Sequence, residues 1–326
     1  MLGSKRTILV FPGQGSQYPG MAKDLYDRFD VVKEVYTQAS GVVGYDMAEL
    51  CFGKSESERR GDLDKTIYTQ TAVLTTGYAC FRAFEEACQK KNVAWDTALL
   101  AGHSLGEYTA LLVSGAMTFE TCLRLVQKRA TYMTESGEKF PGAGLMALMD
   151  RNGGLDFDRI RGLCEDFGVH ITLNNTKRQI VVGGSRDRLS AMSKQLNKKE
   201  TAVKMLNVEG PFHTPMMKPA ADKLKGELES CDISIAAKPI IANVSTHVVV
   251  DPAYIRHELY EQVFHVVNWR QSMEKAIGNG GHLFIEIGPK KVLTHMLKDI
   301  DPSVEATNVE DLASLKKTIE KLRIRS

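Results

Sequence analysis

The segment that most constrains the fold is a serine placed between a short apolar run and a second, longer one. Ala98–Ala101 is followed at once by GHSLG at positions 102–106, and then by an apolar stretch to Val113. This order predicts a buried strand, a sharp turn and a packed helix. Glycines two positions before and after Ser104 let the chain turn so that the hydroxyl stands clear at the helix N-terminus, where the helix dipole favours an oxyanion. The pattern predicts a nucleophile; the alternative is that Ser104 only caps the helix.

Strands and helices alternate along the rest of the chain. Predicted strands are Thr7–Phe11, Ala98–Ala101, Pro239–Ala242 and Leu283–Ile287, and predicted helices include Ala22–Tyr36, Gln70–Lys90 and Leu312–Leu322. Alternation of this kind favours an α/β fold with a parallel sheet.

The middle of the chain has a different order of elements. A strand, a helix, two strands, a helix and a strand are predicted within about 65 residues, at Leu145–Met149, Leu155–Phe167, Val169–Leu173, Ile180–Val182, Arg186–Leu196 and Ala202–Leu206. This β-α-β-β-α-β order is typical of the ferredoxin-like motif. We therefore predict a ferredoxin-like subdomain over residues 140–209, inserted into a larger catalytic domain formed by residues 1–139 and 210–326.

Composition excludes several classes of function. The net charge is +2 and no dense basic block occurs, so we expect neither nucleic acid nor a membrane as a partner. The six cysteines lie far apart without a CxxC pair, so no metal site is expected. The apolar run near the N-terminus, Ile8–Phe11, is too short for a signal peptide or a membrane span. We predict a cytoplasmic protein; an organelle import segment removed from this sequence is the alternative.

A nucleophilic serine requires a base, and the chain has eight histidines. His103 adjoins Ser104 on a tight turn and points elsewhere. His213 lies in the segment GPFHTP, positions 210–215, where the prolines constrain a loop directly before a predicted helix capped by Thr214. That loop can hold an imidazole ring rigidly. His213 is therefore the best candidate among the eight, with a purely structural role as the alternative.

An arginine interrupts an apolar helix face. On the helix predicted from Thr118 to about Thr134, Arg129 falls among the apolar residues Cys122, Leu125, Val126 and Met133. Burying an unpaired guanidinium is costly, so Arg129 needs an anionic partner or faces a pocket. The alternatives are an internal ion pair, or a side chain that reaches out to solvent.

The loop after the first strand reads GQGSQ, positions 13–17. Its glycines allow backbone N–H groups to approach a ligand closely. No Gly-Lys-Ser/Thr follows, and position 18 is Tyr, so neither a nucleoside triphosphate loop nor a dinucleotide fingerprint is present. We interpret the loop as a donor to an oxyanion.

In this order the motifs resemble the malonyl-CoA:acyl carrier protein transacylases of fatty acid synthesis and the related acyltransferases of polyketide synthases. The resemblance covers nearly the whole chain. It is carried by FPGQGSQ at 11–17, YTQ at 68–70, GHSLGE at 102–107, the Arg129 helix, GPFH at 210–213, Asn243-Val244 and EIGP at 286–289.

The resemblance implies an α/β-hydrolase-like core with a ferredoxin-like insert, and it assigns the reacting groups. Ser104 would be the acylated nucleophile and His213 its base. The backbone N–H groups of Gln14 and Leu105 would form the oxyanion hole, and the backbone carbonyl of Asn243 would orient His213.

The resemblance also assigns groups that recognise the acyl chain. Arg129 would bind the free carboxylate of the malonyl group. Gln70 and Gln262 would line the site, and the ring of Phe212 would leave less room for an α-methyl branch. This chain departs from many members of the family at Thr71, where proline is common, and at Ala130, where glycine is common.

The implied reaction is a ping-pong transfer. Malonyl-CoA would acylate Ser104, and the phosphopantetheine thiol of an acyl carrier protein would then take the malonyl group, without a metal or other cofactor. We expect the carrier protein to dock in a cleft beside the insert, near the basic residues Lys177, Arg178, Lys290 and Lys291.

Three other functions remain open. The first is a free-standing acyltransferase that serves a polyketide assembly line. The second is a thioesterase-like hydrolase of acyl carrier proteins, against which Arg129 argues because an acyl group without a carboxylate would leave its charge unpaired. The third is a carrier-protein binding module without catalytic activity, against which the intact Ser104, His213 and Arg129 argue.

Overall fold

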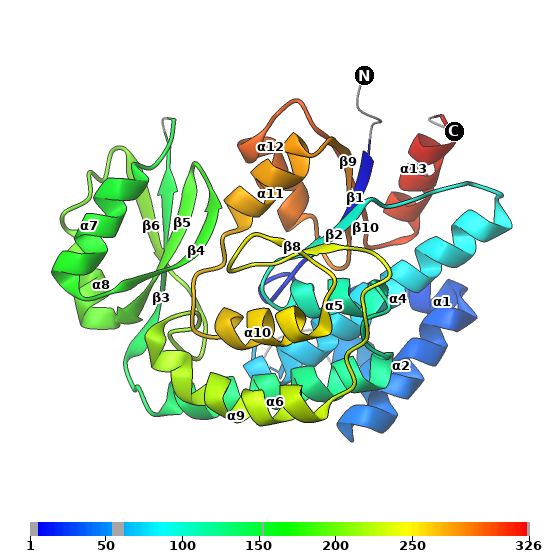
Figure 1. Ribbon diagram of the computed structural model, residues 1–326, viewed down its shortest axis with the longest axis horizontal. Helices are drawn as coiled ribbons and strands as arrows, with labels where there is room; N and C mark the ends of the chain where they lie inside the picture. Colours follow the sequence, from blue (N-terminus) through cyan, green and yellow to red (C-terminus); the bar gives the residue numbers. More distant parts are fainter. Residues whose placement is uncertain (1–5, 54–61, 152, 325–326) are drawn as a thin grey trace.

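A mostly parallel sheet of six strands forms the centre of the molecule (Figure 1). The computed structural model describes residues 6–53, 62–151 and 153–324. The strands are ordered β10-β9-β1-β2-β7-β8. Their bounds are β1 Arg6–Phe11, β2 Leu99–Gly102, β7 Ile240–Ile241, β8 Val248–Val249, β9 Gly281–Ile287 and β10 Glu305–Val309. Every pairing is parallel except β7 with β8.

Helices cover both faces of this sheet because its strands are apolar on both sides. Along β1, Leu9 and Phe11 contribute to one core cluster, whereas Ile8 and Val10 contribute to another. This two-residue alternation places successive side chains on opposite faces. The first cluster includes residues of α2 Asp30–Val43, α4 Thr66–Lys90, α5 Gly106–Val113 and α6 Phe119–Glu138. The second includes residues of α11 Trp269–Gly278 and α12 Val292–Ile300.

The remaining helices of the main body lie around its outside. They are α1 Lys23–Arg28, a π-helical turn at Glu49–Gly53, a 3₁₀ turn at Pro215–Met217, α9 Lys218–Ser230, α10 Pro252–Gln262 and α13 Leu312–Arg323. None of the helices in the described ranges is long and apolar enough to cross a membrane.

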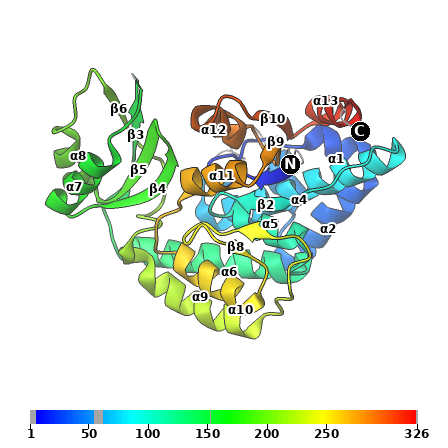
Figure 2. The ribbon, with the colours of Figure 1, turned by 45° about the horizontal axis from the view of Figure 1, so that its top comes forward.

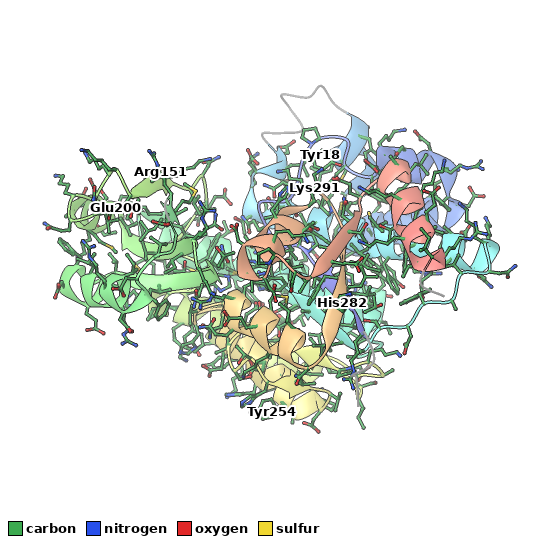
Figure 3. The ribbon with its side chains drawn as sticks, turned by 90° about the horizontal axis from the view of Figure 1, so that it is seen from above. Tyr18, Arg151, Glu200, Tyr254, His282 and Lys291 are labelled. Carbon is green, nitrogen blue, oxygen red and sulfur yellow. The ribbon has the colours of Figure 1, made fainter. Side chains whose placement is uncertain are left out.

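A second, antiparallel sheet stands to one side of the main body (Figure 2). Its elements are β3 Ala143–Asp150, α7 Phe157–Phe167, β4 His170–Thr176, β5 Gln179–Ser185, α8 Arg186–Ser193 and β6 Thr201–Met205, and its strand order is β4-β5-β3-β6. α7 and α8 pack on one face through a separate core that includes Met146, Ile160 and Leu189. We call this unit the small subdomain. Seen from above, Arg151 and Glu200 lie at its outer part, well away from Lys291 on the main body (Figure 3).

The small subdomain is joined to the main body by hydrogen bonds along β4. The amide of Asn174 donates to the carbonyl of Val267 at 2.9 Å, and the amide of Val267 donates to the carbonyl of Thr172 at 2.9 Å. The side chain of Asn174 also donates to Gln271 on α11 at 3.1 Å. This short parallel pairing holds the edge of the small sheet against the main body.

The structure corrects the predicted elements in several places. The single helix expected over Ala22–Tyr36 is divided at Phe29, whose extended backbone ends α1 and begins α2. Strand β10 and the short strand β8 were not predicted. Strand β10 carries the polar residues Glu305, Thr307 and Asn308, so its apolar pattern is weak, and it forms by pairing with β9 at the sheet edge. Thr214 occupies the N-cap position of the 3₁₀ turn at Pro215–Met217, but its hydroxyl makes no capping hydrogen bond and donates instead to the carbonyl of Pro211.

Candidate active site

Ser104 lies on the turn between β2 and α5. Its backbone φ is 50°, a left-handed conformation that a serine rarely adopts. Both flanking glycines are required by close approach: a Cβ at Gly102 would lie 1.9 Å from the carbonyl carbon of Gly106, and one at Gly106 would lie 2.0 Å from the carbonyl oxygen of Phe11. The strand and helix therefore meet closely, and the backbone strain presents the serine side chain at the end of the sheet.

His213 is paired with Ser104. Their Nε2 and Oγ atoms are 2.8 Å apart, and the Nδ1 atom of His213 lies 2.7 Å from the backbone carbonyl of Gln262 at the end of α10. Because a carbonyl oxygen only accepts hydrogen bonds, Nδ1 carries the proton of the neutral ring, and Nε2 accepts from the serine hydroxyl. Burial, and then the charge of Arg129, lower the pKa of His213 to about 3. A hydroxyl hydrogen-bonded to the acceptor nitrogen of a neutral imidazole can act as a nucleophile with the ring as its base.

The prediction that the backbone carbonyl of Asn243 orients His213 is wrong. That carbonyl accepts from the amide of Asn268 at 2.8 Å, and Gln262 supplies the carbonyl at His213 instead. The side chain of Asn243 has a different role. Its Oδ1 accepts from the amide of Ser104 at 2.7 Å, and its Nδ2 donates to the carbonyl of Gly102 at 2.7 Å. Asn243 thus holds the backbone of the turn rather than the base.

The side chain of Arg129 extends from α6 toward Ser104 and His213, and it is 2% exposed. Its Nη1 donates to Oε1 of Gln70 at 2.6 Å, and its Nη2 donates to Oε1 of Gln262 at 3.0 Å and to Oγ of Ser104 at 3.3 Å. The guanidinium carbon lies 5.4 Å from the ring centre of Tyr108. Within the described ranges no carboxylate forms an ion pair with it, and Nε has no hydrogen-bond partner. A buried cation held only by neutral acceptors is a site for an anion.

A buried carboxyl group, Glu107, lies behind these residues. Its Oε2 accepts from Nε2 of Gln262 at 2.5 Å, and its Oε1 accepts from the amide of Asn243 at 3.3 Å. Burial raises the pKa of Glu107 to about 8, against the opposing effect of the hydrogen bond from Gln262. The sequence reasoning did not single out this residue, although it lies in the quoted GHSLGE motif. Neither helix periodicity nor spacing reveals which residues distant in the sequence its carboxyl group meets.

The loop after β1 passes beside the turn. A Cβ at Gly13 would lie 2.3 Å from the carbonyl oxygen of His103, so only glycine permits the two loops to approach this closely. No protein acceptor within the described ranges receives a hydrogen bond from the amides of Gln14 or Leu105. The side chain of Gln14 donates to Thr66 at 3.3 Å, which helps to fix the loop.

A cleft of about 450 Å³ separates this loop from the small subdomain. Its walls include residues 12–16 and His103 on one side, and Leu173, Asn175 and Lys204 on the other. His103 is buried, and its Nε2 lies 2.8 Å from Oδ1 of Asn175. The histidine beside the nucleophile therefore connects the turn to the small subdomain and takes no part as a base. The cleft borders the turn of Ser104 through His103, the residue before it.

Phe212 is buried beside His213, at 4% exposure. Its ring lies against Gly210, where an added Cβ would come 3.2 Å from the ring. Packing of this kind fixes the segment that carries the base. A role for Phe212 in acyl selectivity stays a prediction.

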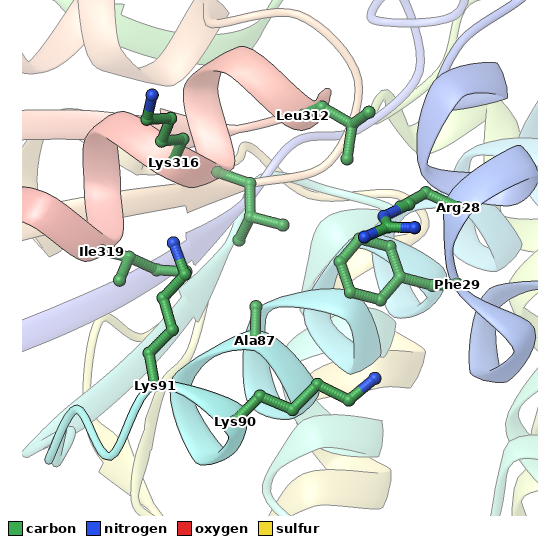
Figure 4. Close-up of a pocket in the computed structure, with 9 residues that line it drawn as sticks. Arg28, Phe29, Ala87, Lys90, Lys91, Leu312, Lys316 and Ile319 are labelled. Carbon is green, nitrogen blue, oxygen red and sulfur yellow. The ribbon is translucent and has the colours of Figure 1, made fainter.

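A second pocket lies elsewhere, between α13 and the ends of α1 and α4 (Figure 4). It has a volume of about 380 Å³ and shares no lining residue with the groups around Ser104. Its lining residues are Arg28, Phe29, Ala87, Lys90, Lys91, Leu312, Leu315, Lys316 and Ile319. We assign it no part in the chemistry at Ser104.

Comparison with known proteins agrees with this geometry. The family model for the acyl transferase domain matches residues 8–323. A malonyl CoA-acyl carrier protein transacylase of Bacillus subtilis is 34% identical over 325 residues, 98% of each chain. Its counterpart in Salmonella typhimurium is 34% identical over 313 residues, 94% of this chain and 96% of the other.

Solved structures of the same kind superpose closely. An acyl-carrier-protein S-malonyltransferase from Burkholderia pseudomallei is 33% identical, with a TM-score of 0.88 over 97% of this chain and 99% of that one. A malonyl-transacylase in complex with a type II PKS acyl-carrier protein is 34% identical, also with a TM-score of 0.88 over 97% of this chain and 99% of that one. The chain is therefore a member of the acyl transferase family, in the branch of the malonyl CoA-acyl carrier protein transacylases.

Proposed function

We propose that this protein moves a malonyl group from malonyl-CoA to the phosphopantetheine thiol of an acyl carrier protein, through an ester on Ser104. One observation carries the proposal. Arg129 is a buried cation without a carboxylate partner among the described residues, and its Nη2 lies 3.3 Å from the nucleophile. A malonyl group supplies the missing carboxylate, two carbons along from the thioester carbonyl carbon. Relatives and solved structures with malonyl transacylase names support the same assignment.

In the first half-reaction, Oγ of Ser104 attacks the thioester carbonyl while Nε2 of His213 takes the hydroxyl proton. The amides of Gln14 and Leu105 are suitable donors to the resulting oxyanion. When the tetrahedral intermediate collapses, the carbon–sulfur bond breaks and the CoA thiolate takes the proton from His213. In the second half-reaction the carrier thiol attacks the seryl ester, and His213 moves its proton to Ser104.

The ping-pong order can be tested by intact mass measurement. Brief exposure to malonyl-CoA, without any carrier protein, is expected to add the mass of one malonyl group to the enzyme. Subsequent addition of a phosphopantetheinylated carrier protein is expected to remove this mass and to add it to the carrier. An enzyme that stays unlabelled, yet transfers malonyl when both substrates are present, would contradict the seryl ester.

We expect His213 to remain a competent base well below pH 6.5. The neutral ring accepts the serine proton, and the pKa of His213 is lowered to about 3, so the ring becomes protonated only as the pH falls toward that value. The rate of acylation is therefore expected to change by less than about twofold between about pH 7 and pH 5, whereas a histidine with the ordinary pKa of about 6.5 would lose most of its activity. Rapid-quench labelling by malonyl-CoA measures this rate. A decline with its midpoint near pH 6.5 would show that the ring is not shielded in this way.

We further propose that the carrier protein docks over the cleft. Lys177 and Arg178 are exposed at the end of β4, and Lys291 is exposed before α12. Opposite charge on a docking partner steers association and lowers KM. Charge reversal of these three residues is expected to raise KM for an acidic carrier protein by about tenfold at low salt, and to leave acylation by malonyl-CoA unchanged. Lys290 is left intact because its Nζ donates to the carbonyl of Gly15 in the oxyanion loop.

Charge reversal of Lys316 and Lys317, which are exposed on α13, provides the control. Steady-state kinetics with carrier protein as the varied substrate separates the two variants. If KM for the carrier protein is the same in the cleft variant and in the α13 control variant, the docking surface lies elsewhere.

We also propose an α/β-hydrolase-like relationship for the main body and a ferredoxin-like one for the small subdomain. The turn that presents Ser104 after a parallel strand supports the first. The β-α-β-β-α-β order and the strand order β4-β5-β3-β6 support the second. The domain limits of 139/140 and 209/210, the cytoplasmic location, and the choice between fatty acid and polyketide synthesis stay predictions.

A further inference from the structure

A network of buried hydrogen bonds connects Arg129, His213 and the turn of Ser104. The carboxyl group of Glu107 lies at its centre. Gln262 contributes three contacts at once: its backbone carbonyl accepts from His213, its Oε1 accepts from Arg129, and its Nε2 donates to Glu107. Gln262 is 0% exposed and Glu107 is 2% exposed, so water does not supply alternative partners.

The orientation of the Gln262 amide decides what Arg129 faces. With Oε1 toward Arg129, the cation has an acceptor; with Nε2 in that place, two donors would oppose each other. Nε2 lies 2.5 Å from Oε2 of Glu107 and 2.9 Å from the carbonyl of Ser104, and both are acceptors. The shorter of these contacts is the one to Glu107.

Glu107 also reaches the nucleophile turn. Its Oε1 accepts from the backbone amide of Asn243, whose side chain accepts in turn from the amide of Ser104. A carboxyl group has two oxygens that can each receive a donor, whereas a glutamine in its place has only one. Glu107 is thus able to satisfy Gln262 and Asn243 together.

We infer that Glu107 is a positioning residue for selection of the acyl group. Its two oxygens fix the positions of the Gln262 side chain and the Asn243 backbone amide. Gln262 in turn holds the Arg129 guanidinium where it faces the substrate carboxylate beside Ser104. This inference rests on the proposed malonyl transfer. Among the described residues Glu107 makes no hydrogen bond to Arg129 or to Ser104 Oγ, so its positioning effect is exerted through Gln262, in addition to its electrostatic interaction with Arg129. Loss of Glu107 should then reduce discrimination between acyl groups more than it reduces acyl transfer itself.

The test compares malonyl-CoA with acetyl-CoA as acyl donors in Glu107→Gln and Glu107→Met. In Glu107→Met both acceptors are gone, and the ratio of kcat/KM for malonyl-CoA to that for acetyl-CoA is expected to fall about tenfold, the scale of losing one buried hydrogen bond. In Glu107→Gln one acceptor remains, and a smaller fall of about threefold is expected. KM for malonyl-CoA should account for most of the change, because the anion site and not the nucleophile is disturbed.

Glu258→Gln is the matched control. Glu258 is also buried, at 4% exposure, and lies on α10 with Gln262, but its Oε2 accepts from the amide of Ser245, and among the described residues it makes no hydrogen bond to Gln262. The ratio is expected to stay at the wild-type value in this variant. A similar fall in Glu258→Gln would show that the loss of any buried carboxyl group nearby has the same effect, and would overturn the inference.

Gln262→Ala provides a second test, because it removes the side chain and keeps the backbone carbonyl that orients His213. If Glu107 acts through Gln262, adding Glu107→Gln to Gln262→Ala should change the ratio by less than about twofold. Losses that multiply independently would overturn the inference, as would a wild-type ratio in a folded Glu107→Gln. Thermal unfolding confirms folding, and Glu107→Gln decides the matter if Glu107→Met does not fold. Labelling of the wild-type enzyme by malonyl-CoA tests the proposed function separately.

Discussion

Replacement of Ser104 by alanine is expected to abolish covalent labelling by malonyl-CoA completely. The hydroxyl is the atom on which the ester forms, and it lies 2.8 Å from the base. No other nucleophile is bonded to His213 within the described ranges. Alanine fits the left-handed backbone of the turn no worse than serine does, so the variant should fold. Intact mass measurement after exposure to malonyl-CoA gives the result directly.

His213→Ala is the companion control, since it retains the nucleophile and removes only the base. Labelling should still occur, but about 10²–10⁴ times more slowly, which is the usual contribution of a positioned base. Labelling of Ser104→Ala at the wild-type rate would place the ester on another residue, and the proposed mechanism would then be wrong.

Arg129→Ala is expected to lower kcat/KM for malonyl-CoA by roughly 30-fold to several-thousand-fold. This range corresponds to the loss of one partner of a buried, bidentate ion pair, about 2–5 kcal/mol. The guanidinium is buried, and its Nε has no hydrogen-bond partner among the described residues. A substrate carboxylate would therefore form a charge-assisted hydrogen-bonded pair with it. Activity toward acetyl-CoA should hold or rise, because acetyl has no carboxylate and the unpaired charge is gone. Steady-state kinetics with the two acyl donors provides the measurement.

Arg129→Lys tests the geometry of the pair. Lysine keeps the charge but lacks the two-pronged donor, and its ammonium cannot donate to Gln70 and Gln262 as the guanidinium does. It should therefore restore little malonyl activity. Equal loss of malonyl and acetyl transfer in a folded Arg129→Ala would mean that Arg129 supports the structure only, and the preference for malonyl would then depend on Phe212.

Local patterns were sufficient to predict the candidate reacting groups. The apolar strand and the glycines around Ser104 identify the turn because their spacing reflects contacts within a few residues. The helical period singles out Arg129, because it places this cation among apolar positions and so indicates either a buried guanidinium or a side chain that reaches solvent. Both expectations concern residues whose environment is set by their own segment.

Groups that meet across the fold were harder to assign. The family resemblance pointed to the Asn243 carbonyl as the acceptor at His213, but the structure places the Gln262 carbonyl there. The two residues adjoin each other in space, with Nε2 of Gln262 3.5 Å from Oδ1 of Asn243, and both serve the same turn. Which of two neighbouring carbonyls meets an imidazole depends on where α10 ends relative to the loop of His213.

The sequence by itself thus determined the elements that carry Ser104, His213 and Arg129, because strand, turn and helix signals are local. Only the tertiary structure decided how these elements are connected: the amide orientation of Gln262, the two acceptors of Glu107, and the contact of His103 with Asn175. Each of these connections joins residues from 72 to 155 positions apart along the chain. The physical reason is that burial obliges polar groups to find partners, and which partners lie within reach is set by the packing of the two sheets and their helices.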